Sequence, residues 1–142
     1  MRSSAARLAI GAGLLGLVLV TAAGAMAFAG RGPGPATDVA IGIHYSKFEP
    51  SQITVPVGVP VTITLRNDDP IDHEWIVGDE AVHAIHRVGT EPLHPDKPTE
   101  VVIPAGTTRT TVITFTSTGS QQFICHLPGH EAYGMVGTVT IE

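Results

Sequence analysis

Cysteine is nearly absent from this chain. Its 142 residues include one cysteine, Cys125. No disulfide can therefore form within one copy of the chain, which excludes the disulfide frameworks that stabilise many small exported domains. A lone free thiol in an exported protein is reactive unless something occupies it. Cys125 is for this reason the first residue whose presence asks for a chemical explanation.

Basic residues are also scarce. The chain carries eight Lys and Arg residues against thirteen Asp and Glu residues. Two of the eight, Arg2 and Arg7, precede a long apolar stretch; without them the formal charge is −7. Binding to a phosphate backbone needs the opposite sign of charge. We therefore expect no nucleic acid among the partners, and neutral or basic proteins instead.

The longest uncharged run lies near the N-terminus. Leu8–Gly30 is 23 residues long and rich in Leu, Ala, Val and Gly. Arg2 and Arg7 before it complete the pattern of a signal peptide, but about 20 apolar residues also suffice to span a bilayer. Residues 1–30 are thus predicted to form an apolar helix that is either a signal peptide or a membrane anchor. Both alternatives place the remainder outside the cytoplasm, as a secreted, periplasmic or outer-face protein.

A change of composition separates this segment from the rest. Residues 31–37 are rich in Gly and Pro, which predicts a linker. The remaining residues, 38–142, are enough for one modest hydrophobic core. They contain no internal repeat and no low-complexity run. The chain is therefore expected to hold one folded domain.

The domain shows little helical periodicity. Apolar residues alternate with Thr and other polar residues in short runs that are rich in Val and Ile and are separated by Gly/Pro turns. This pattern is typical of an all-β sandwich or barrel. Strands are expected at residues 39–43, 53–55, 59–65, 74–77, 101–103, 108–116, 121–125 and 135–141.

One segment breaks the strand rhythm. Residues 78–98 contain few periodic apolar positions, and we expect them to form an excursion from the sandwich with a helical turn at residues 80–87. One such turn would place His83 and His86 on the same face. With Asp79 or Glu80, or with His94 further on, they could bind a second divalent metal. The alternative is a solvated polar loop.

Soft and borderline metal donors cluster near the C-terminus. Cys125, His130 and Met135 follow the spacing C-x4-H-x4-M between two predicted strands. Pro128 and Gly129 allow the intervening loop to fold back. A thiolate, an imidazole and a thioether can therefore surround one point.

His73 is the best candidate for a fourth donor. It follows the turn Asn67–Pro70 and starts a predicted strand next to Trp75. Two imidazoles and a thiolate with a weak axial thioether form the ligand set of blue-copper electron-transfer sites. The thiolate stabilises both copper states, and imidazoles suit both.

These motifs together resemble the cupredoxin superfamily, which includes plastocyanin, azurin and sulfocyanin. The loop spacing is most similar to that of sulfocyanin-like and related small bacterial members. The resemblance extends over residues 38–142 and rests on Phe48–Pro50, Val57–Gly58, Leu65–Asp68, His73–Trp75 and Cys125–Gly137.

The resemblance implies a single Greek-key β-sandwich with one type 1 copper ion that cycles between Cu(I) and Cu(II). Its ligands would be His73, Cys125, His130 and Met135, and the exposed edge of His130 would pass electrons. Many members have an Asn beside the first His that bonds the copper-bound sulfur. This chain has Asp72 and Glu74 at those positions, so its tuning of the potential is expected to differ.

We expect a monomeric electron carrier and not an enzyme, with a cytochrome or an oxidase as the partner that the family implies. A first alternative is a copper-binding or trafficking protein that uses the His-bearing segment. A second is a subunit of a nitrite-reductase-like or oxidase-like enzyme, in which a His next to the ligand Cys connects two copper centres. His126 has that position, but Ile124 lies on the other side of Cys125, where multicopper oxidases have a second His. Because neighbouring residues at a strand end point to opposite sides, we expect His126 to point away from the copper, as a surface or hydrogen-bonding residue.

Overall fold

The structure is a computed structural model that describes residues 34–89 and 97–142. The predicted N-terminal apolar helix, His94 and the first part of the linker lie outside these residues. Among the described residues, no helix is both long and apolar enough to cross a membrane. The last linker residues are already tied to the domain, because the backbone N–H of Ala36 donates to the carbonyl of Thr54.

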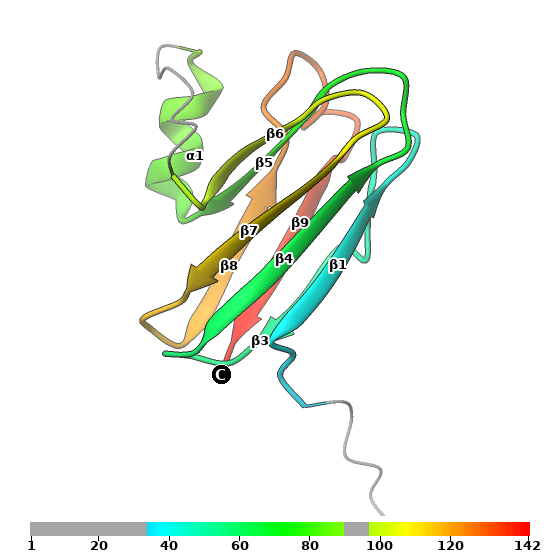
Figure 1. Ribbon diagram of the computed structural model, residues 1–142. Helices are drawn as coiled ribbons and strands as arrows, with labels where there is room; N and C mark the ends of the chain where they lie inside the picture. The colour runs from blue at the N-terminus through cyan, green and yellow to red at the C-terminus, as the bar shows by residue number, and fades with distance from the viewer. Residues whose placement is uncertain (1–33, 90–96) are drawn as a thin grey trace, which may run out of the picture. The chain divides into compact units, whose positions relative to one another are not determined.

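Strands dominate the described residues and form two sheets that face each other (Figure 1). The first sheet has the order β2-β1-β4-β7 and the second has the order β3-β9-β8-β5-β6. The prediction of a β-sandwich is confirmed. The strand bounds are β1 Asp38–Ile43, β2 Phe48–Glu49, β3 Gln52–Val55, β4 Pro60–Asn67, β5 His73–Gly78, β6 Glu100–Ile103, β7 Thr108–Thr114, β8 Gly119–Ile124 and β9 Val136–Ile141.

Two parallel pairings connect strands that are not neighbours in the sequence. β1 runs parallel to β4, and β3 runs parallel to β9. The other pairs, including β5 with both β6 and β8, are antiparallel. β2 has only two residues and pairs with β1. The sequence did not predict this strand, because two residues are too few to show an alternating pattern.

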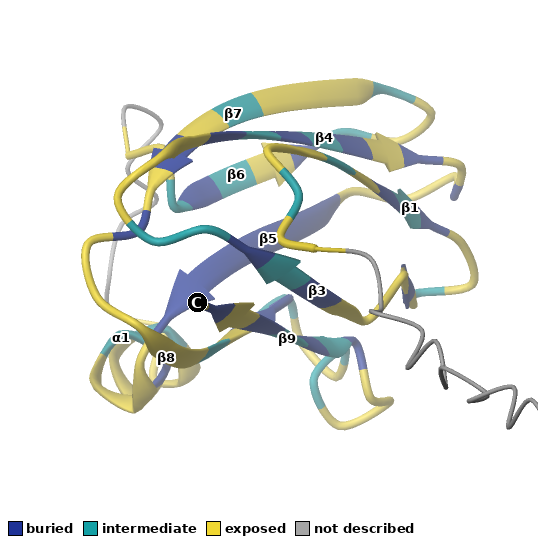
Figure 2. Ribbon diagram, turned by 90° about the horizontal axis from the view of Figure 1, so that it is seen from below, coloured by how far each residue is buried: buried dark blue, intermediate teal, exposed yellow. Residues whose placement is uncertain are grey.

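The core lies between the sheets and follows the alternation of side chains. In β4, Val61, Ile63 and Leu65 are fully buried, whereas the threonines between them are not. Trp75 and Phe123 fill the same space from the second sheet, with ring centroids 5.9 Å apart. The outer positions of β7 are mostly exposed threonines (Figure 2). Alternation alone therefore placed these strands correctly.

β5 departs from this rule because it is buried on both faces. All six of its residues are buried. Trp75 and Val77 belong to the core between the sheets, whereas Ile76 is equally buried but lies outside that core cluster. The outer face is covered by the helix α1, Glu80–Arg87, which contacts β5 and lies outside the sheet in Figure 1.

Local chemistry explains where α1 begins and how closely it approaches β5. The carboxylate of Asp79 caps the helix by accepting from the backbone N–H of Val82 at 3.1 Å. A Cβ atom at Gly78 would lie 2.8 Å from the Val82 side chain, so a glycine is needed there. The helix predicted at residues 80–87 is confirmed, and it spans about two turns rather than one.

The tight contact of Gly137 with Phe123 gives a test of this packing. A Cβ atom at Gly137 would lie 2.1 Å from the Phe123 ring and 2.7 Å from the carbonyl oxygen of Ser51. We expect Gly137→Ala to lower the free energy of unfolding by about 1–3 kcal/mol or more, as measured by denaturant titration. The matched control is Gly42→Ala in β1, where the nearest atom would be 3.6 Å away. Equal stabilities of the two variants would contradict the packing described.

Candidate metal centre

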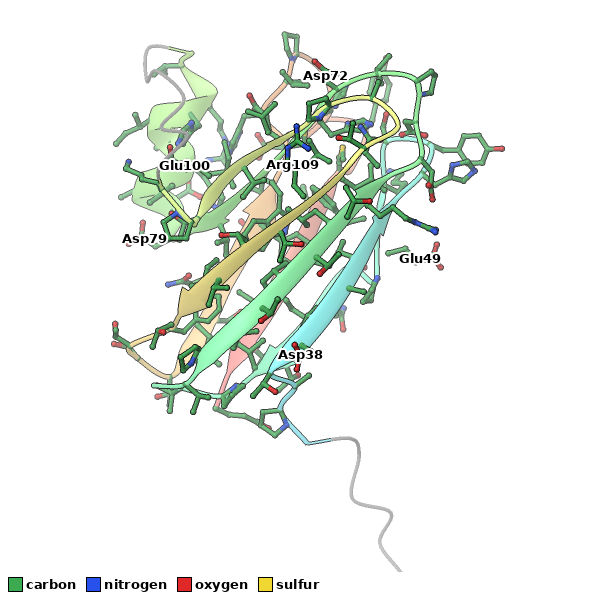
Figure 3. The ribbon with its side chains drawn as sticks, viewed as in Figure 1. Asp38, Glu49, Asp72, Asp79, Glu100 and Arg109 are labelled. Carbon is green, nitrogen blue, oxygen red and sulfur yellow. The ribbon has the colours of Figure 1, made fainter. Side chains whose placement is uncertain are left out.

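Three predicted metal donors meet at one end of the sandwich. His73 starts β5, Cys125 follows β8, and His130 lies in the loop that returns to β9. Asp72, the residue before His73, is labelled at this end in Figure 3. The Nδ1 atom of His130 lies 3.2 Å from His73 Nδ1 and 3.2 Å from Cys125 Sγ. All three donor atoms lie within 4.8 Å of one another.

Burial and chemistry show that these donors suit a soft or borderline ion. Cys125 and His73 are fully buried, and His130 is partly exposed. One thiolate and two imidazoles around a single point are the equatorial donors of a blue-copper site. Since the three atoms converge without rearrangement of the backbone, the residues present fit one copper ion.

A buried carboxylate orients His73. Its Nε2 atom lies 2.9 Å from Asp69 Oδ2. Because a carboxylate only accepts, the proton resides on Nε2, and Nδ1 keeps a lone pair for the metal. Burial alone would raise the pKa of Asp69, but the backbone N–H groups of Ser46 and Tyr45, together with His73, lower it below its usual range. The carboxylate therefore stays charged beside the histidine.

Asn67 holds the turn in which Asp69 lies. Its side-chain oxygen accepts from the backbone N–H of Asp69 at 2.9 Å, and its side-chain nitrogen reaches the carbonyls of Ile71 and Ile103 at 2.8 and 3.0 Å. Asn67 is itself buried. The turn is thus attached to β6, and the position of His73 follows from it. The sequence did not predict a functional role for Asp69, although it lies four residues before His73.

The sulfur of Cys125 is held by the main chain of β5. The backbone N–H of Glu74 donates to Sγ at 3.3 Å. The donor is a main-chain N–H, which every residue except proline provides. The contact to the sulfur is therefore kept, although this chain has Glu74 where many family members have Asn. Burial raises the pKa of the Cys125 thiol, and the N–H groups of Glu74 and Leu127 act in the opposite direction. In the metal-free chain the thiol keeps its proton, and a metal must displace it.

His130 and Met135 complete the loop. Burial, and then the nearby His73, lowers the pKa of His130, so this imidazole is neutral and free to ligate near pH 7. Met135 is fully buried; its N–H donates to the His130 carbonyl at 3.0 Å, and its own carbonyl accepts from Cys125 at 3.2 Å. Met135 therefore lies beside the loop it was predicted to close. Its role as the axial ligand stays a prediction.

A second histidine cluster is formed by His83 and His86 of α1 and by His126, the residue after Cys125. His83 Nδ1 lies 3.0 Å from His126 Nε2, and the His86 ring stacks on His126 with centroids 5.7 Å apart. The side chain of His126 is 3% exposed. The surface location expected for it was wrong, whereas the expected hydrogen-bonding role is confirmed.

The carboxylates that the sequence paired with this cluster are engaged elsewhere. Asp79 caps α1, and Glu80 binds Arg87 at 2.5 Å. His83 is buried, so the alternative of a solvated loop is wrong for it. Burial lowers the pKa of His83, and the carbonyls of Gln122 and Gly78 partly offset this. Burial, followed by His83, lowers the pKa of His126 to about 4.

The chain is similar to known copper-binding proteins. Residues 36–142 match the family described as copper binding proteins, plastocyanin/azurin family. The chain is 36% identical over 100 residues to the copper-resistant cuproprotein CopI of Rubrivivax gelatinosus, with 68% of this chain and 60% of that protein aligned. It is 28% identical to CopI of Pseudomonas aeruginosa, with 74% and 75% aligned. The chain thus spans less than two thirds of the Rubrivivax protein.

Solved structures of similar fold include auracyanins. Reduced auracyanin from Roseiflexus castenholzii superposes with a TM-score of 0.66 at 25% identity, covering 77% of this chain and 99% of that one. Auracyanin A from Chloroflexus aurantiacus, described as a "blue" copper protein, gives 0.59 at 25% identity, covering 77% and 100%. These likenesses agree with one copper ion at the His73, Cys125 and His130 site.

The contact between Asp69 and His73 can be tested by a single substitution. Asp69→Asn removes the charge that orients the imidazole, and we expect it to weaken copper binding about 10–100-fold. Competition with a chelator of known affinity measures the change. Asp72→Asn is the matched control, since the Asp72 carboxylate accepts only from the N–H of Ala105 among the contacts described. Equal losses in both variants would contradict the role given to Asp69.

Proposed function

Since the chain belongs to the plastocyanin/azurin family of copper-binding proteins, we propose that it is an exported one-electron carrier with a single blue copper site. Copper supplies the one-electron couple when it is bound. The protein supplies three converging donors, one from β5 and two from the β8–β9 connection. We further propose Met135 as the weak axial donor, which would tune the potential.

The observation that carries this proposal is the preformed donor set. Asp69 holds His73, and the N–H of Glu74 holds the Cys125 sulfur. The Met135 backbone binds both Cys125 and His130 of the ligand loop. A site with such external supports can keep one geometry in both oxidation states. A small geometric change between states is what rapid electron transfer requires.

The two imidazoles differ in their access to solvent. His73 is completely buried, whereas His130 is partly exposed in the loop. Tyr133 of the same loop is 75% exposed. We therefore assign His130 as the exit for electrons, with the surface around it as the docking face. Partners would be redox proteins such as a cytochrome or an oxidase, and the acidic charge of the domain would favour neutral or basic ones.

A copper-tolerance function is the second candidate. It is favoured by the relatives, both of which are described as copper-resistant cuproproteins. In such a function the chain would bind copper to limit its toxicity or to pass it on. The contacts that hold the His73, Cys125 and His130 site would serve either function, so retention of copper during a redox cycle separates them.

The test is to cycle the copper-loaded full chain between reduced and oxidised states in the presence of chelators for Cu(I) and Cu(II). A carrier keeps its copper through repeated cycles and shows one reversible potential. Loss of copper to the chelator in one oxidation state would contradict the carrier and support copper delivery.

The variant Met135→Leu, which approximately conserves volume, should keep copper but shift the potential if the thioether is an axial ligand.

A further inference from the structure

His83 and His126 face each other, and their neighbours leave one nitrogen of the His126 ring without a hydrogen-bond partner. His83 Nε2 lies 3.2 Å from the carbonyl oxygen of Gln122. A carbonyl only accepts, so Nε2 carries the proton of the neutral ring, and Nδ1 keeps its lone pair. That lone pair faces His126 Nε2 at 3.0 Å.

Neither neutral tautomer of His126 satisfies both of its neighbours. With the proton on Nε2, His126 donates to His83, but its Nδ1 lone pair then faces the Glu131 carboxylate at 3.5 Å. With the proton on Nδ1, that contact becomes favourable, but two lone pairs face each other between His126 and His83. The His126 Nδ1 atom is buried and makes no hydrogen bond within the described residues. Such a buried orphan is costly and calls for an explanation.

An ion bound to both rings would take up the two lone pairs that otherwise lack a partner. It would accept the lone pairs of His83 Nδ1 and His126 Nε2, while the proton on His126 Nδ1 would face the Glu131 carboxylate at 3.5 Å. His83 would then donate its other N–H to the carbonyl of Gln122, as metal-bound histidines in proteins almost always do with an oxygen. Two nitrogens about 2.0–2.1 Å from one ion are about 2.9–3.4 Å apart at angles between a right angle and the tetrahedral angle. The observed 3.0 Å lies within that range.

The surroundings also suit a cation. The carboxylate of Glu131 is held in place by Arg87, with contacts of 3.0 and 2.8 Å to its Oε1 atom. The buried Glu100 lies 3.4 Å from His86 Nε2 and 3.0 Å from Lys97. The His86 ring stacks on His126. In Figure 3, Glu100 and Asp79 are labelled on the side of the sheet that carries α1.

The geometry points to a second metal site, formed by His83 and His126 with His86 beside them, that takes a divalent first-row ion such as Cu(II) or Zn(II). Imidazole donors suit this class of ion. The site is separate from the His73, Cys125 and His130 centre, although Cys125 and His126 are consecutive residues. It stands whether the first site carries electrons or stores copper.

The test uses the full chain with its first site already filled with copper. Zn(II) is added, free metal is removed by dialysis at fixed free zinc, and both metals are counted by mass spectrometry. We expect one copper and one zinc per chain. His83→Ala should keep the copper and its thiolate absorption and lose the zinc. Glu131→Gln should weaken zinc binding about 10–100-fold.

The matched control is His44→Ala, which removes an exposed histidine outside this cluster and should retain the zinc. Nitrogen NMR of the wild-type ring signals gives a readout that depends on no variant: zinc should shift those of His83 and His126. Zinc that stays bound in His83→Ala, zinc that replaces the copper, or ring signals that do not change at millimolar zinc would each overturn the site.

Discussion

The alternation of side chains along β5, and across the end of β8, is the constraint on which both histidine sites depend. Successive residues of a strand point to opposite faces of a sheet. Trp75, Val77 and Phe123 consequently enter the core, whereas Ile76 and Ile124 are buried outside it, on the face that α1 covers. The same alternation separates the next two residues. Cys125 lies with His73 and His130 at the metal centre, whereas His126 lies on the opposite face and contacts His83 of α1.

Glu74 connects the two faces. Its backbone N–H binds the Cys125 sulfur, and its carboxylate accepts the backbone N–H of His126. Burial raises the pKa of Glu74, and the backbone N–H of His126 and the nearby His86 partly offset this. One residue therefore contacts the ligand thiol with its main chain and the neighbouring histidine cluster with its side chain.

How far the sequence alone leads depends on the range of the contacts. Cys125, His130 and Met135 lie in one loop whose spacing already predicts a metal site, and the first two lie together in the structure. His73 was a weaker prediction because its place depends on strand pairing, yet it converges on the same point. Asp69 and the contact between His83 and His126 could not be predicted. They arise from the packing of a turn against β6 and of α1 against β5, which no local spacing encodes.

We expect Cys125 to bind copper as a thiolate at a site with two imidazoles. The visible absorption spectrum of the copper-loaded full chain, recorded beside that of Cys125→Ser, tests this most directly. We predict an intense thiolate-to-copper band at one copper per chain, which bleaches on reduction, returns on oxidation and is absent from the variant. A colourless copper-loaded protein, or the same band in Cys125→Ser, would contradict copper binding by the Cys125 thiolate.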